Sequence, residues 1–275
     1  MGMVVWWVVS DRDNSVEEEL PESVTWCVID PLPVEMEGEY PGRLLVAAGK
    51  HVFEVNGEEM TWCLEVSEDV DGCYWLSPDV VVFWISGNGA YVVDHNGFAL
   101  WRCLDFDLTC ACPTMEGGVD RLVVGTSQGE VYETTEEEVG WRVVVSEKLE
   151  VEEPHPVDWV SRDVGGHAVT LGSANKVILV GEDGELGGSW GVISPRRAQL
   201  LSSGDVLVCS DDGIMEIAEG GGLVWKELSG ASQAQWLPCG VLLVCGEDEA
   251  VGRSSEGGAL WRLKMEELSS IEGSL

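Results

Sequence analysis

Short apolar runs recur along the chain, and segments in which apolar and polar residues alternate follow them. The runs include "RLLVAAG", "VVVFWISG", "RLVVGTS", "HAVTLGS", "DVLVCS" and "VLLVCG", and the alternating segments include "HVFEVN", "AYVVDH", "EVYETT" and "IMEIAE". A continuous apolar run that ends in glycine or serine predicts a buried strand, and alternation predicts a strand with one polar face. Each pair therefore predicts two consecutive strands of a β-hairpin.

Tryptophan residues mark a repeat that contains these hairpins. A glycine, a short apolar step and a basic residue surround several of them, as in "GFALWRC", "GGLVWKE" and "GGALWRL". A more variable strand precedes the apolar run, as in "AQLLSSG" and "AQWLPCG". We interpret each tryptophan as the start of the outermost strand of a four-stranded unit of roughly forty residues. The seven positions are Trp26, Trp62, Trp101, Trp141, Trp190, Trp225 and Trp261.

Seven such units predict an all-β fold, a seven-bladed β-propeller of four-stranded blades, as a single domain over residues 1–275. A β-sandwich or a pair of barrels would also contain many short strands, but neither explains a tryptophan at one place in each unit. A large flat side chain would fill the widening gap between twisted blades. Because the first unit starts directly with "VVWWVVS", we expect the C-terminal segment "SSIEGSL", residues 269–275, to pair in the first blade and close the ring.

The charge of the chain restricts its partners. It has 50 acidic and 15 basic residues, a formal net charge of -35, which excludes nucleic acid because phosphate backbones are bound by basic patches. The acidic residues are spread over the whole length, which is typical of a hydrated surface adapted to a salt-rich cytoplasm. The alternative is a dedicated surface for a basic partner. The N-terminus lacks a basic region before its apolar run, and no apolar run is long enough to span a membrane. We therefore expect a cytoplasmic monomer.

Candidate catalytic and metal motifs are weak. The segment "GTSQG" around Ser127 matches a nucleophile elbow in its letters, but that motif requires a helix after the strand, and here a strand is predicted. Cys110 and Cys112 have no second cysteine or histidine pair at zinc-ligand spacing. Cys27 and Cys63 each follow a repeat tryptophan, so we expect small core residues at one equivalent position. The sequence predicts no catalytic residue, no metal and no cofactor.

A long connection between two units is the best candidate for a binding site. The interval from Trp141 to Trp190 is the longest and contains "SEKLEVEEPHPVDW", and long loops on rigid scaffolds frequently carry function. If the strand assignment is right, its polar residues lie on the same face as two arginines of the next connection. A solvated insertion without function is the alternative. The candidate binding residues are His51, Glu152, Glu153, His155, Asp158, Arg196 and Arg197.

The repeat resembles a known family. The segment "VLLVCGEDEAVGRSSEGGALWRL" looks like the repeat of pyrroloquinoline-quinone-type propellers and their arylsulfotransferase-like relatives, in which Gly-x-x-Trp follows a hairpin. The quinoprotein enzymes would imply an adjacent cysteine pair, whereas Ala111 separates Cys110 from Cys112. The resemblance therefore implies a non-catalytic member that acts as an assembly scaffold for an unknown protein partner. The alternative is an enzyme or ligand-binding protein that uses the central channel for a small anionic or quinone-like ligand, with His51, His155 or Arg196 as candidate groups.

Overall fold

The computed structural model describes residues 26–29, 43–56, 59–77, 79–114, 121–145, 154–161, 165–227, 231, 233–236, 242–245, 249–254 and 258–264. In this part of the chain the strands form six four-stranded antiparallel sheets, and each sheet follows the chain order from one edge to the other. The strands of the first three sheets are β1 (Trp26–Ile29), β2 (Arg43–Ala48), β3 (His51–Asn56) and β4 (Glu59–Glu65); β5 (Gly72–Ser77), β6 (Val80–Ile85), β7 (Gly89–Asp94) and β8 (Ala99–Cys103); and β9 (Leu108–Pro113), β10 (Leu122–Thr126), β11 (Glu130–Thr134) and β12 (Val139–Val144).

The second half of the described chain repeats the same arrangement. The strands of the last three sheets are β13 (Trp159–Val160), β14 (His167–Leu171), β15 (Lys176–Val180) and β16 (Leu186–Gly191); β17 (Pro195–Leu200), β18 (Val206–Ser210), β19 (Gly213–Ile217) and β20 (Leu223–Glu227); and β21 (Gln233–Trp236), β22 (Leu242–Cys245), β23 (Glu249–Arg253) and β24 (Ala259–Lys264).

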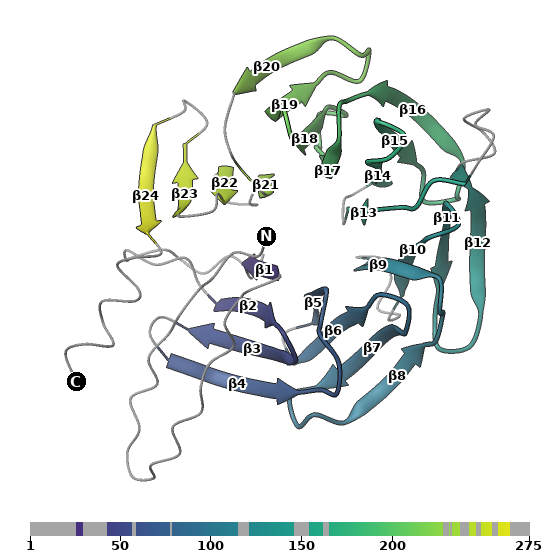
Figure 1. Cartoon of the computed structure of the whole chain (residues 1–275), viewed down its shortest axis with the longest axis vertical. Coiled ribbons are helices and arrows are strands. Elements are labelled where there is room, and N and C mark those ends of the chain that lie inside the picture. The colour runs from purple at the N-terminus through teal and green to yellow at the C-terminus, as the bar shows by residue number, and fades with distance from the viewer. Residues whose placement is uncertain are drawn as a thin grey trace.

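The sheets are arranged radially as the blades of a propeller (Figure 1). The first strand of each sheet lies toward the centre and the fourth strand at the periphery. Consecutive blades contact each other through their inner strands, from β1 and β2 against β5 to β17 and β18 against β21. The prediction of an all-β propeller with four-stranded blades is therefore confirmed.

The predicted number of blades is wrong, because the described residues form six sheets rather than seven. Trp26 lies in β1, the innermost strand of the first blade, where it pairs with Ala47 of β2. The other six repeat tryptophans lie in the outermost strands β4, β8, β12, β16, β20 and β24. Trp26 is thus not equivalent to them, and the count of tryptophans exceeds the count of blades. The apolar run at the N-terminus and the tail that we expected to close the ring lie outside the described residues.

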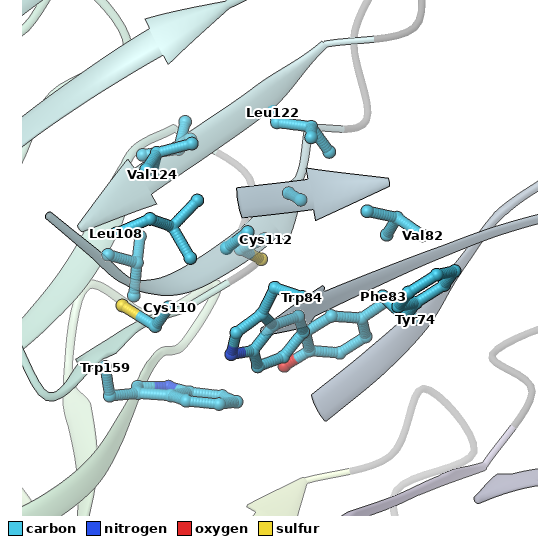
Figure 2. Close-up of a cluster of buried hydrophobic side chains, with 14 of the residues drawn as sticks. Tyr74, Val82, Phe83, Trp84, Leu108, Cys110, Cys112, Leu122, Val124 and Trp159 are labelled. Carbon is cyan, nitrogen blue, oxygen red and sulfur yellow. The ribbon is translucent and has the colours of Figure 1, made fainter. Parts of the chain in front are cut away.

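The apolar runs form the second strand of each blade, and this explains their composition. β10, β14 and β18 are buried at every position, because both faces of a blade pack against neighbouring blades. The third strands β11, β15 and β19 interrupt their buried positions with partly exposed ones. Between the second and third blades, aromatic and aliphatic side chains form a core around Trp84 (Figure 2), whose side chain is only 2% exposed.

The repeat tryptophans pack against the next blade. Trp62 of the first blade stacks on His95, with ring centroids 5.3 Å apart, and its Nε1 donates to the His95 carbonyl at 2.8 Å. A Cβ at Gly184, in the β15–β16 turn, would lie 2.9 Å from the Trp141 ring of the preceding blade. Gly184 has a φ of 79°, which favours glycine as well. Within one repeat, the tryptophan therefore packs at the interface with the next blade, and the turn glycine packs at the interface with the preceding blade.

The predicted equivalence of Cys27 and Cys63 is also wrong. Cys27 lies in β1 opposite Val46, whereas Cys63 lies in the outer strand β4 opposite Phe53. Cys63 is exposed, because the tryptophan before it points toward the neighbouring blade and alternation turns the next side chain outward. Cys110 and Cys112 of β9 are buried, as expected for an inner strand.

Candidate interaction face

Most of the predicted binding residues that the structure describes lie on one face of the ring. In an antiparallel four-stranded blade, the turn between the second and third strands lies at the same end as the connection that enters the next blade. We call the surface made by these turns and connections the connection face. It includes the turns 49–50, 86–88, 127–129, 172–175 and 211–212 and the connections 66–71, 104–107, 154–158 and 192–194.

Aspartates directly before three inner strands fix this face. The backbone N–H of Ser86 donates to Asp71 Oδ2 at 2.6 Å, and Asp71 precedes β5. The hydroxyl of Ser127 donates to Asp107 Oδ1 at 3.0 Å, and Asp107 precedes β9. Each aspartate thereby ties the connection from the preceding blade to the second turn of its own blade. We call Asp71, Asp107 and Asp158 the connection aspartates.

Asp158 repeats this arrangement before β13, and its environment differs from that of a freely solvated carboxylate. Its Oδ2 accepts the N–H of Gly172 in the β14–β15 turn. Burial raises the pKa of Asp158, while the hydrogen bond from Gly172 opposes that shift. His155 joins the same turn, because its Nδ1 lies 2.8 Å from the Ser173 hydroxyl. Two of the predicted residues therefore hold one turn of the fourth blade.

The two predicted arginines lie in β17 and point to different surroundings. Arg196 is exposed and binds Asp211 of the β18–β19 turn, with Nε at 2.8 Å and Nη2 at 2.7 Å from Oδ1. Arg197 is half-buried, and its guanidinium carbon lies 4.9 Å from the centroid of the Trp159 ring. The two side chains therefore do not project together from a connection, because both residues lie in a strand and each has a different partner.

The remaining predicted residues do not join these groups. His51 is the first residue of β3 and pairs with Glu65 of β4, so it lies at the connection face of the first blade. Its Nδ1 is buried and makes no hydrogen bond with a residue that the structure describes. Glu152 and Glu153 lie outside the described residues.

Aromatic side chains from nonadjacent blades meet near the middle of the ring. The ring centroids of Tyr74 on β5 and Trp159 on β13 are 6.1 Å apart, although these strands belong to the second and fourth blades. Tyr74 also stacks on Trp84, with ring centroids 6.0 Å apart, and Figure 2 shows the three side chains in one cluster. Arg197 of the fifth blade adds a cation–π contact to Trp159. Side chains of three blades therefore occupy this part of the centre.

The weak catalytic and metal motifs of the sequence lie at positions that do not suit those functions. Ser127 lies in the turn between strands β10 and β11, so no helix follows it. Burial raises the pKa of Cys110 to about 12, which keeps this thiol protonated.

Within the residues described, no group of three or more histidine, cysteine, aspartate or glutamate side chains comes together to hold a metal ion. The described part also contains no helix that is long and apolar enough to cross a membrane.

Sequence reasoning missed the connection aspartates Asp71 and Asp107. Their signal is an aspartate directly before a buried inner strand, as in "DGCYW", "DLTCA" and "DWV". The connections vary in length and composition between repeats, so an aspartate there does not stand out from the pattern of tryptophans and apolar runs. A carboxylate that follows an outer strand and precedes an inner one is well placed to accept a turn N–H.

Comparisons with solved structures agree on the fold. A protein of unknown function from Bacteroides caccae has a TM-score of 0.65 and 18% identity, covering 82% of this chain and 94% of the other. The WD40 β-propeller domain of Doa1 has a TM-score of 0.62 and 15% identity, covering 86% and 77%. BBS1N, solved in complex with ARL6DN, has a TM-score of 0.55 and 13% identity, covering 79% and 74%.

These likenesses show the β-propeller fold alone, because the sequences are so different. No protein-family model matches the chain. No curated protein sequence matches it either. Membership in the pyrroloquinoline-quinone-type repeat family stays a prediction, whereas the coarser propeller architecture is confirmed.

Proposed function

We propose that this protein is a non-enzymatic β-propeller scaffold that binds another protein as a monomer in a salt-rich cytoplasm. The contact between Tyr74 and Trp159 carries the proposal, because it fills part of the ring centre with packed side chains. A small-molecule site in a propeller requires a concave cavity that surrounds the ligand. Packed aromatic side chains favour the rim of the ring over its centre as the binding surface.

The connection face supports a role in protein binding. Its turns are held by Asp71, Asp107 and Asp158, so a partner would meet a surface that is already ordered. Ordered surfaces lose less conformational entropy on binding than flexible loops. The structure of BBS1N in complex with ARL6DN shows that a protein of similar fold binds another protein. His155 and Arg196 are the candidate contact residues on this face.

Partner capture from the native cell tests this function. The full chain, used as bait in an extract at the native salt concentration, is expected to retain one protein in near-stoichiometric amounts. The double variant H155N/R196E should retain less of it, because the partly exposed His155 and the exposed Arg196 both lie on the connection face. Arg121→Gln is the matched control, because Arg121 pairs with Glu133 at the start of β10, at the opposite end of the blades.

A different result would contradict the proposal. If native mass spectrometry of the purified protein shows a bound small molecule, and no protein is retained by the bait, then the channel-ligand alternative is favoured. Equal capture by the wild type and by H155N/R196E would keep the scaffold function but remove these two residues from its binding surface.

A further inference from the structure

Exposed apolar side chains concentrate along one outer strand. Eight large hydrophobic residues are exposed in the described part of the chain, and four of them lie between residues 98 and 106. We call these four, on and beside β8 of the second blade, the apolar stripe. They are Phe98, Leu100, Leu104 and Phe106, with 70%, 45%, 53% and 82% of their surface exposed.

Strand geometry puts the middle of the stripe on one side of the blade. Leu100 and Arg102 are both exposed, whereas Trp101 between them is 8% exposed and faces the core. Leu104 follows β8 at the same even spacing, so it continues this outward row. The register with β7 shifts between Ala99 and Trp101, so this alternation does not extend to Phe98. β8 pairs with β7 only, which leaves its second edge without a described neighbour at the periphery of the ring (Figure 1).

Arg102 lies in the middle of the apolar stripe. Basic residues at the corresponding position of two other blades each have an acidic partner within their own blade. Arg142 also follows a repeat tryptophan, and it pairs with Glu130 at 3.5 Å. Lys226 follows Trp225 and pairs with Asp212, also at 3.5 Å. In both blades the carboxylate lies at or directly before the start of the third strand.

The second blade has Asn88 directly before its third strand, in place of this carboxylate. The Asn88 amide donates to Glu68 Oε1 at 2.8 Å, and its oxygen accepts the Tyr91 hydroxyl at 2.7 Å. Arg102 consequently makes no ion pair with a described residue, although acidic residues outnumber basic ones 50 to 15 in the chain. It is an exposed cation between exposed apolar side chains.

We propose that the outer edge of β8 is a docking site for an extended segment of a partner protein. The segment has apolar side chains at alternate positions and one aspartate or glutamate opposite Arg102. Backbone pairing to an open edge supplies register, and side chains on one face supply specificity. A carboxylate of the partner segment would complement the charge of Arg102, and this favours such a segment over a second copy of the chain. A second copy paired antiparallel about Arg102 would place two arginines opposite each other, which is destabilising.

This inference rests on the proposed function, because it names a surface and a partner chemistry for the scaffold. It extends that function beyond the connection face to the periphery of the second blade. A single charge on an edge strand commonly serves to prevent pairing with other strands. Here we infer that the charge of Arg102 selects which strand pairs with β8. If Arg102 selects an acidic partner strand, Arg102→Leu weakens binding, whereas if it only prevents pairing, Arg102→Leu strengthens binding.

A synthetic peptide tests the site. The probe alternates valine and threonine, replaces one central valine by aspartate, carries lysines at both ends for solubility and bears a fluorescent label. Its binding to the full chain is measured by fluorescence anisotropy at constant potassium chloride. Arg102→Glu should weaken binding by about three- to tenfold, because an exposed ion pair is replaced by a repulsion. A peptide with lysine in place of the aspartate should recover binding to R102E.

Matched variants separate the site from other causes. Lys226→Glu changes the equivalent residue of the fifth blade, which already has Asp212 as its partner, and should leave peptide binding unchanged. Leu100→Ser should weaken binding without lowering the melting temperature, because this side chain is exposed. Hydrogen exchange should show peptide-dependent protection of β8 amides.

Several outcomes would overturn the site. These are no measurable binding of the probe, equal binding by R102E, or tighter binding by Arg102→Leu, which would show that the arginine only prevents pairing. A dimer in sedimentation that L100S abolishes would assign the stripe to a second copy. If R102E bait still captures the native protein partner, the scaffold function stands and this surface alone is wrong.

Discussion

Close packing at a single glycine shows how strongly the inner strands depend on residue size. A Cβ at Gly72, the first residue of β5, would lie 2.2 Å from the Trp84 ring. Trp84 is 2% exposed and lies in the hydrophobic core. We therefore expect Gly72→Ala to destabilise the fold by about 1–3 kcal/mol, the usual cost of overpacking. Gly191→Ala, in an outer strand with open space around it, is the control, and chemical denaturation should show little change there.

His167 makes the stability of the fold depend on pH. Burial lowers the pKa of this imidazole, although its hydrogen bond to the Ser161 carbonyl partly opposes the shift. Because the native pKa lies below the unfolded value of about 6.5, the unfolded state binds the proton first as the pH falls. Stability is therefore fully present above about pH 6.5 and decreases below it.

The variant His167→Gln should flatten this pH dependence between about pH 7 and pH 5. The free energy of unfolding, measured by denaturant titration at several pH values, gives the slope. His155→Gln, at a partly exposed histidine on the connection face, is the matched histidine-to-glutamine control. An unchanged slope in H167Q would show that another group controls the acid transition.

At the scale of elements, each connection aspartate joins two blades through one turn. Replacing Asp71 by alanine removes the acceptor of the Ser86 N–H. We expect faster amide exchange at Ser86 and a loss of about 1–2 kcal/mol, because a turn donor loses its partner. Asp69→Ala, two residues earlier and exposed, should leave both quantities unchanged. Slow exchange at Ser86 in D71A would mean that the turn is held by its backbone alone.

Much of this architecture could be predicted from the sequence, because burial imposes patterns on strands. The runs around Val124 and Val208 form the buried second strands that their composition indicates. The position of Trp26 could not be predicted in this way, because a tryptophan in an inner strand and one in an outer strand look alike without the pairing partners. For the candidate site, the sequence located His155 and Arg196 on one face. The separation of Arg197 from Arg196 could not be predicted, because both lie in strand β17, whose register shifts at this point, rather than in a connection.

On the scale of the whole molecule, most acidic side chains have no basic side chain with which to form an ion pair. The described ion pairs of Arg121, Arg142, Arg196 and Lys226 each lie within one blade. Arg253 of the sixth blade instead pairs with Glu227 of the fifth. With 50 acidic against 15 basic residues, most carboxylates have no cation to pair with. Repulsion between blades is then a cost that all of them share in the folded ring.

Salt should relieve that repulsion. The Debye length falls from about 10 Å at 0.1 M to about 3 Å at 1 M salt, so carboxylates on neighbouring blades stop repelling each other over the distances that separate them. We expect the melting temperature to rise by about 5 to 10 °C as potassium chloride increases from about 50 mM to about 2 M. A variant in which the exposed residues Glu136 and Glu137 become lysine should show a smaller rise, since part of the repulsion is already removed. Sodium chloride at equal concentration should act alike, because screening depends on ionic strength and not on the cation. A melting temperature independent of potassium chloride would mean that the carboxylates are neutralised within the native protein in some other way, and the net charge of -35 would then have to be explained by a bound basic partner.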